Sequence, residues 1–204
     1  MVPMSSTEQQ RVEASLSAAD RALLMRVARD SIRHGLETGR PLEVDPADYP
    51  QSLQVRRATF VTLNERGQLR GCIGHLEAVQ PLVADVAENA FNAAFRDPRF
   101  PPLSPAEFDQ LEIHISVLSP PEPLAFDSEE DLLAKIRPGV DGLILEDGVH
   151  RGTFLPAVWE SLPDKRQFWA NLKLKAGLPM DHWSDQLRVL RYTTESFSEA
   201  ETRV

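Results

Sequence analysis

The chain has 204 residues, of which 42% are hydrophobic and 26% charged, as is typical of a globular protein able to bury a sizeable core. Asp and Glu outnumber Lys and Arg by 31 to 22, so the net charge of −9 disfavours nucleic acid as a partner. No apolar run is long enough to span a bilayer, Met1 to Glu13 is polar, and a single cysteine excludes an intramolecular disulfide, so we expect a cytoplasmic protein that does not cross a membrane.

The first part of the chain predicts a tail, a helix and a connector. Met1 to Leu16 shows little periodicity, and we expect a mobile tail followed by one domain over residues 17–204. A capping box at Ser17 begins a helix that ends at Gly39. The stretch from Pro41 to Gln54 then reads as an extended connector with Asp-Pro and Tyr-Pro turn signals.

The next stretch predicts a β-hairpin. β-Branched and aromatic residues fill Thr59 to Leu63, and Asn64 to Gly67 is a short polar turn that ends in a glycine. The return strand, Gln68 to Gly74, carries the only cysteine of the chain, Cys72.

Cys72 is the residue with the clearest chemical interpretation. Side chains alternate along a strand, so Arg70 is expected on the same face as Cys72, where its positive charge favours the thiolate. Gly71 and Gly74 remove bulk around the thiol and indicate a bulge or a close approach to the backbone. Cys72 and Arg70 are therefore candidate catalytic residues, and the two glycines are candidate binding positions. The alternatives are a small buried side chain for Cys72 and an ion pair with a neighbouring strand for Arg70.

A second helix and a proline-rich loop follow the hairpin. Pro81 begins the helix, and the segment DPRFPP, residues 97–102, cannot continue it and predicts a rigid loop. If this loop overhangs the thiol, Asp97 pairs locally and Arg99 is suited to grip a carboxylate or a phosphate. Ser104 then begins a short helix with another capping box.

Two histidines are candidate partners of the thiol. Leu111 to Ser119 alternates apolar and polar residues, which predicts a strand with His114 on its polar face. His114 would complete a Cys–His dyad if its strand neighboured the strand of Cys72, and His75 could reach the same pocket from the strand end. The alternatives are a hydrogen-bonded surface histidine and a loop residue.

The last third of the chain contains a second predicted hairpin. Ser128 caps a helix, and Gly142 to Leu155 forms a second hairpin around a tight Asp-Gly turn. Its return strand places Arg151 as the first hairpin places Arg70. We expect Arg70 and Cys72 to open onto a cleft between two lobes, with either DPRFPP or the Arg151 hairpin near its rim. Asp164 caps the last clear helix, and residues 187–193 predict a final strand. Three tryptophans are expected either in the core or in the packing of the lobes: Trp159, Trp169 and Trp183.

Interleaved helices and strands with two tight hairpins favour an α+β fold with a mainly antiparallel sheet and flanking helices. The sequence has no Cys-x-x-Cys and no His-x-x-x-His spacing, so no metal site is predicted. Phosphate-loop and dinucleotide fingerprints are absent as well, so no cofactor is evident.

The segment Leu69 to Gly74, LRGCIG, resembles the signature of the AMMECR-one domain family, whose prokaryotic members are called AmmeMemoRadiSam system protein A. The resemblance covers roughly Leu23 to Tyr192 and includes FVTL, PLVADVAENA, AAFRDPRFPPLSPAEF, ISVLSPPEPL, DGLIL, FLP and KAGLP. It implies one α+β domain with two unequal lobes and an association with a Memo-type protein and a radical SAM protein. It implies no particular reaction.

The chain departs from the family pattern at two positions. Many relatives carry a second cysteine where this chain has Lys173, so a two-cysteine metal or redox pair does not form here. Glu is more usual in the family at the position of His114, so a mechanism shared by the family does not depend on that imidazole.

Two functions are consistent with these features. The first is an enzyme or accessory factor that uses Cys72 in a pathway with the Memo-type and radical SAM proteins. The chain lacks the three-cysteine set of a radical SAM enzyme, so it does not run that chemistry itself. The second is a non-catalytic binding or scaffold domain that docks through the LRGCIG hairpin, and it predicts that Cys72 tolerates Ser or Ala.

Overall fold

The structure, a computed structural model, describes residues 16–202. The tail predicted over Met1 to Leu16 lies outside the described residues except for Leu16, which is buried and whose backbone N–H donates to the Glu195 carboxylate at 3.1 Å. The chain divides into two compact units. Unit 1 comprises the residues up to Leu118 together with those from Glu195 onward, and unit 2 comprises Ser119–Thr194. Each unit has its own antiparallel sheet and its own apolar core, so the α+β prediction is confirmed.

Unit 1 is built on a four-stranded sheet in the order β2-β1-β3-β8. Its strands are β1 (Thr59–Glu65), β2 (Gln68–Gly74), β3 (Leu111–Leu118) and β8 (Thr194–Ser198). β1 pairs antiparallel with both β2 and β3, which confirms the predicted hairpin. Arg66 and Gly67 form its turn with φ angles of 52° and 77°, the positive values that a tight hairpin requires.

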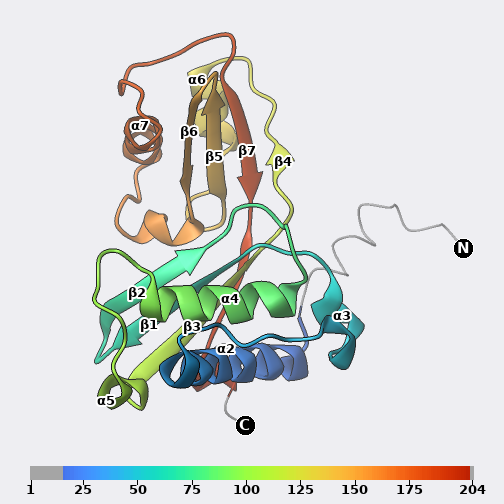
Figure 1. The fold of residues 1–204 in the computed structure, drawn as a ribbon. Helices are drawn as coiled ribbons and strands as arrows, with labels where there is room; N and C mark the ends of the chain where they lie inside the picture. The colour runs from blue at the N-terminus through green and yellow to red at the C-terminus, as the bar shows by residue number, and fades with distance from the viewer. Residues whose placement is uncertain (1–15, 203–204) are drawn as a thin grey trace, which may run out of the picture. The chain divides into compact units, whose positions relative to one another are not determined.

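Two long helices cover one face of this sheet, α2 (Ala18–Thr38) and α4 (Leu82–Phe95), as Figure 1 shows. α2 begins at the predicted capping box of Ser17 and ends at Gly39, whose φ is 71°. The core between the helices and the sheet contains Leu24, Ile32, Val61, Leu63, Val83, Val86, Ala90, Ile113, Ile115 and Val117. The alternate residues of the strands therefore point to the opposite face of the sheet, away from these helices.

Short helical segments complete unit 1. They are η1 (Pro46–Asp48), α3 (Gln51–Gln54), α5 (Pro105–Phe108) and α8 (Glu199–Thr202). The extended connector predicted over Pro41 to Gln54 is wrong for its second half, because Asp45 caps η1 and a fully buried Leu53 anchors α3. α5 begins at the predicted capping box of Ser104.

Unit 2 contains the second sheet, in the order β4-β7-β5-β6. Its strands are β4 (Glu122–Pro123), β5 (Gly142–Asp147), β6 (His150–Phe154) and β7 (Arg188–Tyr192). β5 pairs with β6 through the predicted second hairpin and with β7 on its other side. Three helical segments flank this sheet: α6 (Glu129–Lys135), η2 (Pro156–Glu160) and α7 (Lys165–Lys175). Ser128 and Asp164 cap α6 and α7 as predicted.

The tryptophans of unit 2 have different environments. Trp159 and Trp169 are buried, and Trp159 stacks on Phe168 with ring centroids 3.7 Å apart. Trp183 is 40% exposed, so it is not a core residue. It lies in the loop that precedes β7.

Candidate functional site

Cys72 lies on β2, the edge strand of the unit 1 sheet, and pairs with Thr62 on β1. Ile73 packs against the core and Gly71 abuts α4, so alternation turns the Cys72 side chain to the face opposite the helices. The thiol is half-buried, and the Thr62 hydroxyl donates a hydrogen bond to Cys72 Sγ at 3.2 Å. A donor directed at sulfur stabilises the thiolate more than the thiol.

His114 lies in the same row of the sheet but not beside the thiol. Thr62 pairs with Cys72 on one side and with His114 on the other, so β1 separates the two residues. Two strand spacings amount to about 10 Å, too far for a hydrogen bond. The Cys–His dyad therefore does not form, and His114 Nε2 lies 3.4 Å from Glu112 Oε1 instead.

The DPRFPP loop lies against the outer edge of β2, as the overhang hypothesis requires. The backbone N–H of Cys72 donates to Asp97 Oδ2 at 2.9 Å, and Arg99 Nη2 donates to the Cys72 carbonyl at 3.3 Å. Asp97 and Arg99 also bond to each other at 2.7 Å. The pair thus takes the place of a neighbouring strand at Cys72 and protects this edge from pairing with another chain.

The electrostatics of this pair leave a cation beside the thiol. The hydrogen bond from the Arg99 guanidinium is the main reason that the pKa of the Asp97 carboxyl is held well below its usual range, and the backbone N–H groups of Cys72 and Arg99 add to it. The pKa of Arg99 is raised, chiefly by its bond to Asp97 and, to a smaller extent, by the charge of a Cys72 thiolate. Asp97 is buried, whereas 55% of the Arg99 side chain is exposed and accessible to an anionic ligand.

Arg70 does not lie on the thiol's face. A β-bulge between its neighbours shifts the register, since Leu63 pairs with Gly71 while Asn64 pairs with Leu69. The extra residue breaks the alternation on which the same-face prediction depended. Arg70 is buried, and its guanidinium bonds to Glu107 of α5 at 2.7 Å and to the Pro101 carbonyl at 3.0 Å. The ion-pair alternative is thus correct, although the acid comes from a helix rather than from a strand.

Gly71 and Gly74 are explained by packing within unit 1. A Cβ atom on Gly71 would collide with the carbonyl oxygen of Ala93 in α4. A Cβ atom on Gly74 would collide with the carbonyl oxygen of Thr59 and the ring of Phe60. The bulge and the close approach that the glycines predict are both present, but the approaching groups belong to α4 and β1.

His75 contacts α4, on the face of the sheet opposite the thiol. Its Nδ1 lies 2.8 Å from Oδ1 of Asp85, which is fully buried. The other Asp85 oxygen accepts hydrogen bonds from the Thr59 N–H and hydroxyl and from Asn89, at 2.6–2.9 Å. This network holds the imidazole, which is about one-third exposed, in one orientation. The sequence prediction missed Asp85, although an acid in the apolar stripe of a helix is a usable signal.

Arg151 lies on β6 of unit 2, where its Nε is 3.3 Å from Glu146 Oε1 on the paired strand β5. Lys173 is also in unit 2. It is buried and bonds to Glu129 at 2.7 Å, so it has a structural partner.

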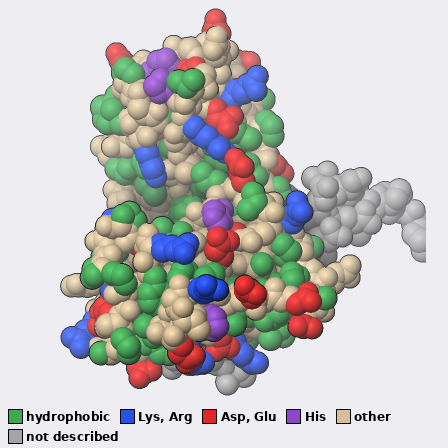
Figure 2. Space-filling view, in the orientation of Figure 1, with side chains coloured by type: hydrophobic (Ala, Val, Ile, Leu, Met, Phe, Trp, Pro, Cys, Tyr) green, Lys and Arg blue, Asp and Glu red, His purple; other side chains and the backbone are tan. Residues whose placement is uncertain are grey.

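Between residues 16 and 202, no group of three or more His, Cys, Asp or Glu side chains is arranged to hold a metal ion. None of the helices in the described part of the chain has the length and apolar character needed to cross a bilayer. On the face shown in Figure 2, Lys and Arg side chains are interspersed with Asp and Glu side chains, and the described residues there form no continuous basic stripe.

Comparison with known proteins shows similarity over most of the chain. The sequence profile of the AMMECR1 family matches residues 25–197. A curated protein of Methanothermobacter thermautotrophicus is 43% identical over 192 residues, which cover 91% of this chain and 97% of that protein. Protein PH0010 of Pyrococcus horikoshii is 41% identical over 86% of this chain and 88% of its own length. The crystal structure titled as that of uncharacterized protein PH0010 matches with a TM-score of 0.78 and covers 87% of this chain and 90% of that one.

Proposed function

The chain belongs to the AMMECR1 family, and from this membership we propose that it is an enzyme or accessory factor that uses the Cys72 thiol. We place its activity in a cytoplasmic pathway shared with Memo-type and radical SAM proteins. The chain has one cysteine and lacks a cluster-binding set, so its part is a separate step from the radical chemistry.

One observation carries this proposal: the hydroxyl of Thr62 donates to Cys72 Sγ at 3.2 Å. Hydroxyl donation favours the thiolate, which is the nucleophilic form of cysteine. The thiolate sulfur would form a bond to an electrophilic carbonyl carbon of the substrate, while the carbon–oxygen π bond breaks and its electron pair moves to the oxygen, which then takes a proton from water. The exposed guanidinium of Arg99, bonded to the Cys72 carbonyl, would hold a carboxylate or phosphate of the same substrate.

None of the other predicted site residues on the hairpin and on β3 contacts the thiol in this proposal. Arg70 bonds to the Pro101 carbonyl and so steadies the loop that carries Arg99. His75 contacts Asp85, and His114 lies beyond Thr62, so neither imidazole touches the thiol.

The test is the rate of alkylation by iodoacetamide at pH 7 and at pH 10, with Cys72→Ser as the blank. Thr62→Val keeps the side-chain shape and removes the donor, so we expect about fivefold slower alkylation at pH 7, equivalent to one hydrogen bond of about 1 kcal/mol. An unperturbed thiol is largely ionised at pH 10, so the two rates should converge there. Thr38→Val is the matched control, since this exposed threonine at the end of α2 donates to the His34 carbonyl, and it should leave both rates unchanged. Equal rates for wild type and Thr62→Val at pH 7 would contradict the proposal.

A second candidate is the docking surface. Packing explains the two glycines, Gly71 and Gly74, and Glu107 pairs with the charge of Arg70. Structural constraints therefore account for these three residues of the LRGCIG segment without any reaction. Leu69 at the start of this segment is 43% exposed and available for contact with a partner. This function predicts that Cys72→Ser keeps full function and that Leu69→Glu abolishes it, the opposite of what the thiol function predicts.

A further inference from the structure

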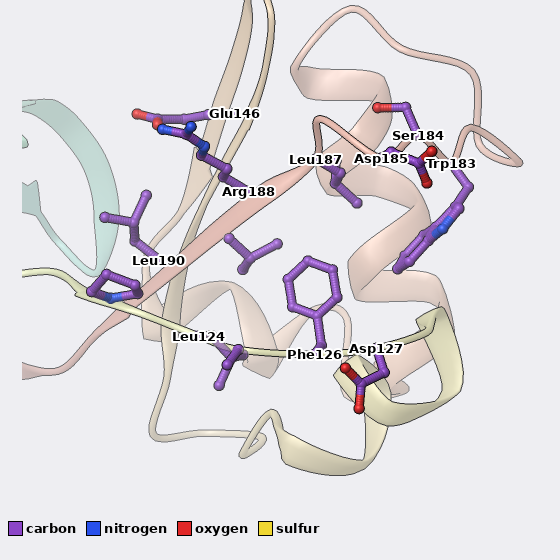
Figure 3. A pocket seen from close by; sticks show the side chains of 13 residues that line it. Leu124, Phe126, Asp127, Glu146, Trp183, Ser184, Asp185, Leu187, Arg188 and Leu190 are labelled. Carbon is purple, nitrogen blue, oxygen red and sulfur yellow. The ribbon is translucent and has the colours of Figure 1, made fainter.

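Unit 2 contains a hollow of about 520 Å³ that lies far along the chain from Cys72. Its floor and walls come from the segment around β4, from β7 and from the loop that precedes β7 (Figure 3). The apolar side chains that line it include Leu124, Phe126, Trp183, Leu187 and Val189. A volume of this size matches the sites that proteins use for small molecules.

Trp183 is held in place although it is partly exposed. The residues on both sides of it bond to Asp147: His182 Nε2 at 2.5 Å and the Ser184 hydroxyl at 2.7 Å. The His182 carbonyl also accepts a hydrogen bond from the buried Lys173 at 3.2 Å. The indole thus stands as a fixed wall of the hollow, and it meets the Phe126 ring edge to face with centroids 5.7 Å apart.

The charges of the hollow are unevenly distributed. Glu146 and Arg188 are opposite each other in the β5–β7 register, and Figure 3 shows them side by side at one end. Asp127 and Asp185 lie at the other end, with Trp183 in the same part of the view. Among the ion pairs between described residues, none includes Asp127 or Asp185. The aromatic end of the hollow therefore has two carboxylates that form no ion pair within the described part of the chain.

We propose that this hollow binds an organic cation, a protonated amine or quaternary ammonium attached to an apolar group. The face of an aromatic ring attracts a cation, and tryptophan does so most strongly. Asp127 and Asp185 supply the complementary charge, while Leu187 and Val189 contact the apolar group. The lining includes three carboxylates, from Asp127, Glu146 and Asp185, and one arginine, Arg188, so an anionic ligand is the poorer match. This site belongs to unit 2 and does not depend on the function proposed for Cys72.

The probe is benzyltrimethylammonium, and its matched controls are benzyl alcohol, which is neutral, and phenylacetate, which is anionic. Binding is followed in the full chain by the indole N–H resonance of Trp183, assigned from its loss in Trp183→Phe. Trp159 and Trp169 are 4% and 1% exposed and serve as internal references. We expect saturable shifts confined to Trp183, a dissociation constant on the order of millimolar for a probe of this size, and weaker binding of both controls.

Substitutions then identify the groups responsible. Asp127→Asn with Asp185→Asn should weaken the cationic probe about five- to thirtyfold and leave benzyl alcohol unchanged, the scale of a lost cation interaction of about 1–2 kcal/mol. Glu160→Gln neutralises an exposed carboxylate outside the hollow and should change nothing. Thermal unfolding of each variant verifies that it is folded. Absence of binding, equal affinity for the neutral probe, or tighter binding of phenylacetate that Arg188→Gln abolishes would each overturn the proposal.

Discussion

The ion pair between Arg70 and Glu107 should stabilise unit 1 by much more than an ordinary surface pair. The Arg70 side chain is 9% exposed and the Glu107 side chain 25% exposed, and two hydrogen bonds of 2.7 and 3.3 Å join them. The Ser104 N–H and hydroxyl both donate to the same carboxylate at 2.7 Å. Removal of the carboxylate charge by Glu107→Gln would leave a buried guanidinium without its counter-charge.

The size of this stabilising free energy follows from the pKa of Glu107. Its bond to Arg70, with help from Ser104, lowers this pKa from the usual 4.5 to about 2. The shift corresponds to about 3 kcal/mol in full, and partial solvent screening reduces it, so we expect Glu107→Gln to cost about 2 kcal/mol near pH 7. A carboxyl with a lowered folded-state pKa contributes its full stability above the unfolded value of 4.5. That contribution is lost as the pH falls toward about 2.

The measurement is urea unfolding of wild type and Glu107→Gln at pH 7, 4.5 and 3, followed by far-UV circular dichroism. Tryptophan fluorescence is unsuitable, because all three tryptophans belong to unit 2. The matched control is Asp30→Asn, which removes the acid from an exposed pair with Arg33 and should cost no more than about 0.5 kcal/mol. Equal costs for the two variants, or a Glu107→Gln cost that is the same at pH 7 and pH 3, would refute this reasoning.

Two further predictions concern packing and the loop of unit 2. Gly71→Ala should destabilise unit 1 by about 1–3 kcal/mol because the new Cβ collides with α4, whereas Gly139→Ala meets only backbone strain of about 1 kcal/mol. The midpoints of urea unfolding compare the two variants, and equal costs would contradict the collision. The pKa of the Asp147 carboxyl is lowered, first by its bond to His182. The loop that Asp147 anchors should therefore stay in place above the pH range in which carboxyl groups ordinarily titrate, and it should loosen as the pH falls through the lowered pKa. Acrylamide quenching of Trp183 should therefore rise at acid pH and in Asp147→Asn at neutral pH, and unchanged quenching in the variant would count against the anchor.

Local sequence signals were sufficient to predict the α+β class of this fold and most of its long helices and strands. Ser17, Ser104, Ser128 and Asp164 begin helices where predicted, because a cap depends only on the three residues that follow it. The hairpin of Thr59 to Gly74 forms for a similar reason, since two short strands and a turn with positive φ meet within sixteen residues of chain. The contact between the DPRFPP loop and Cys72 was only a condition in the sequence reasoning, and the hydrogen bonds of Asp97 and Arg99 to the Cys72 backbone meet it.

Only the tertiary structure decided what surrounds the thiol. The bulge that turns Arg70 toward Glu107 depends on the register between β1 and β2, which no local pattern specifies. β8 was not predicted as a strand, because it forms by pairing beside β3, from which the whole of unit 2 separates it along the chain.

The same limit applies to Asp85 and Trp183. Asp85 is buried with hydrogen bonds from Thr59, His75 and Asn89, and the loop of Trp183 is held by the bonds of its neighbours to Asp147. Each of these environments is made by groups that meet only after the chain has folded, whereas capping and turn signals act between neighbours. Burial and charge pairing are properties of the assembled structure, and a single sequence read locally contains the residues but not their partners.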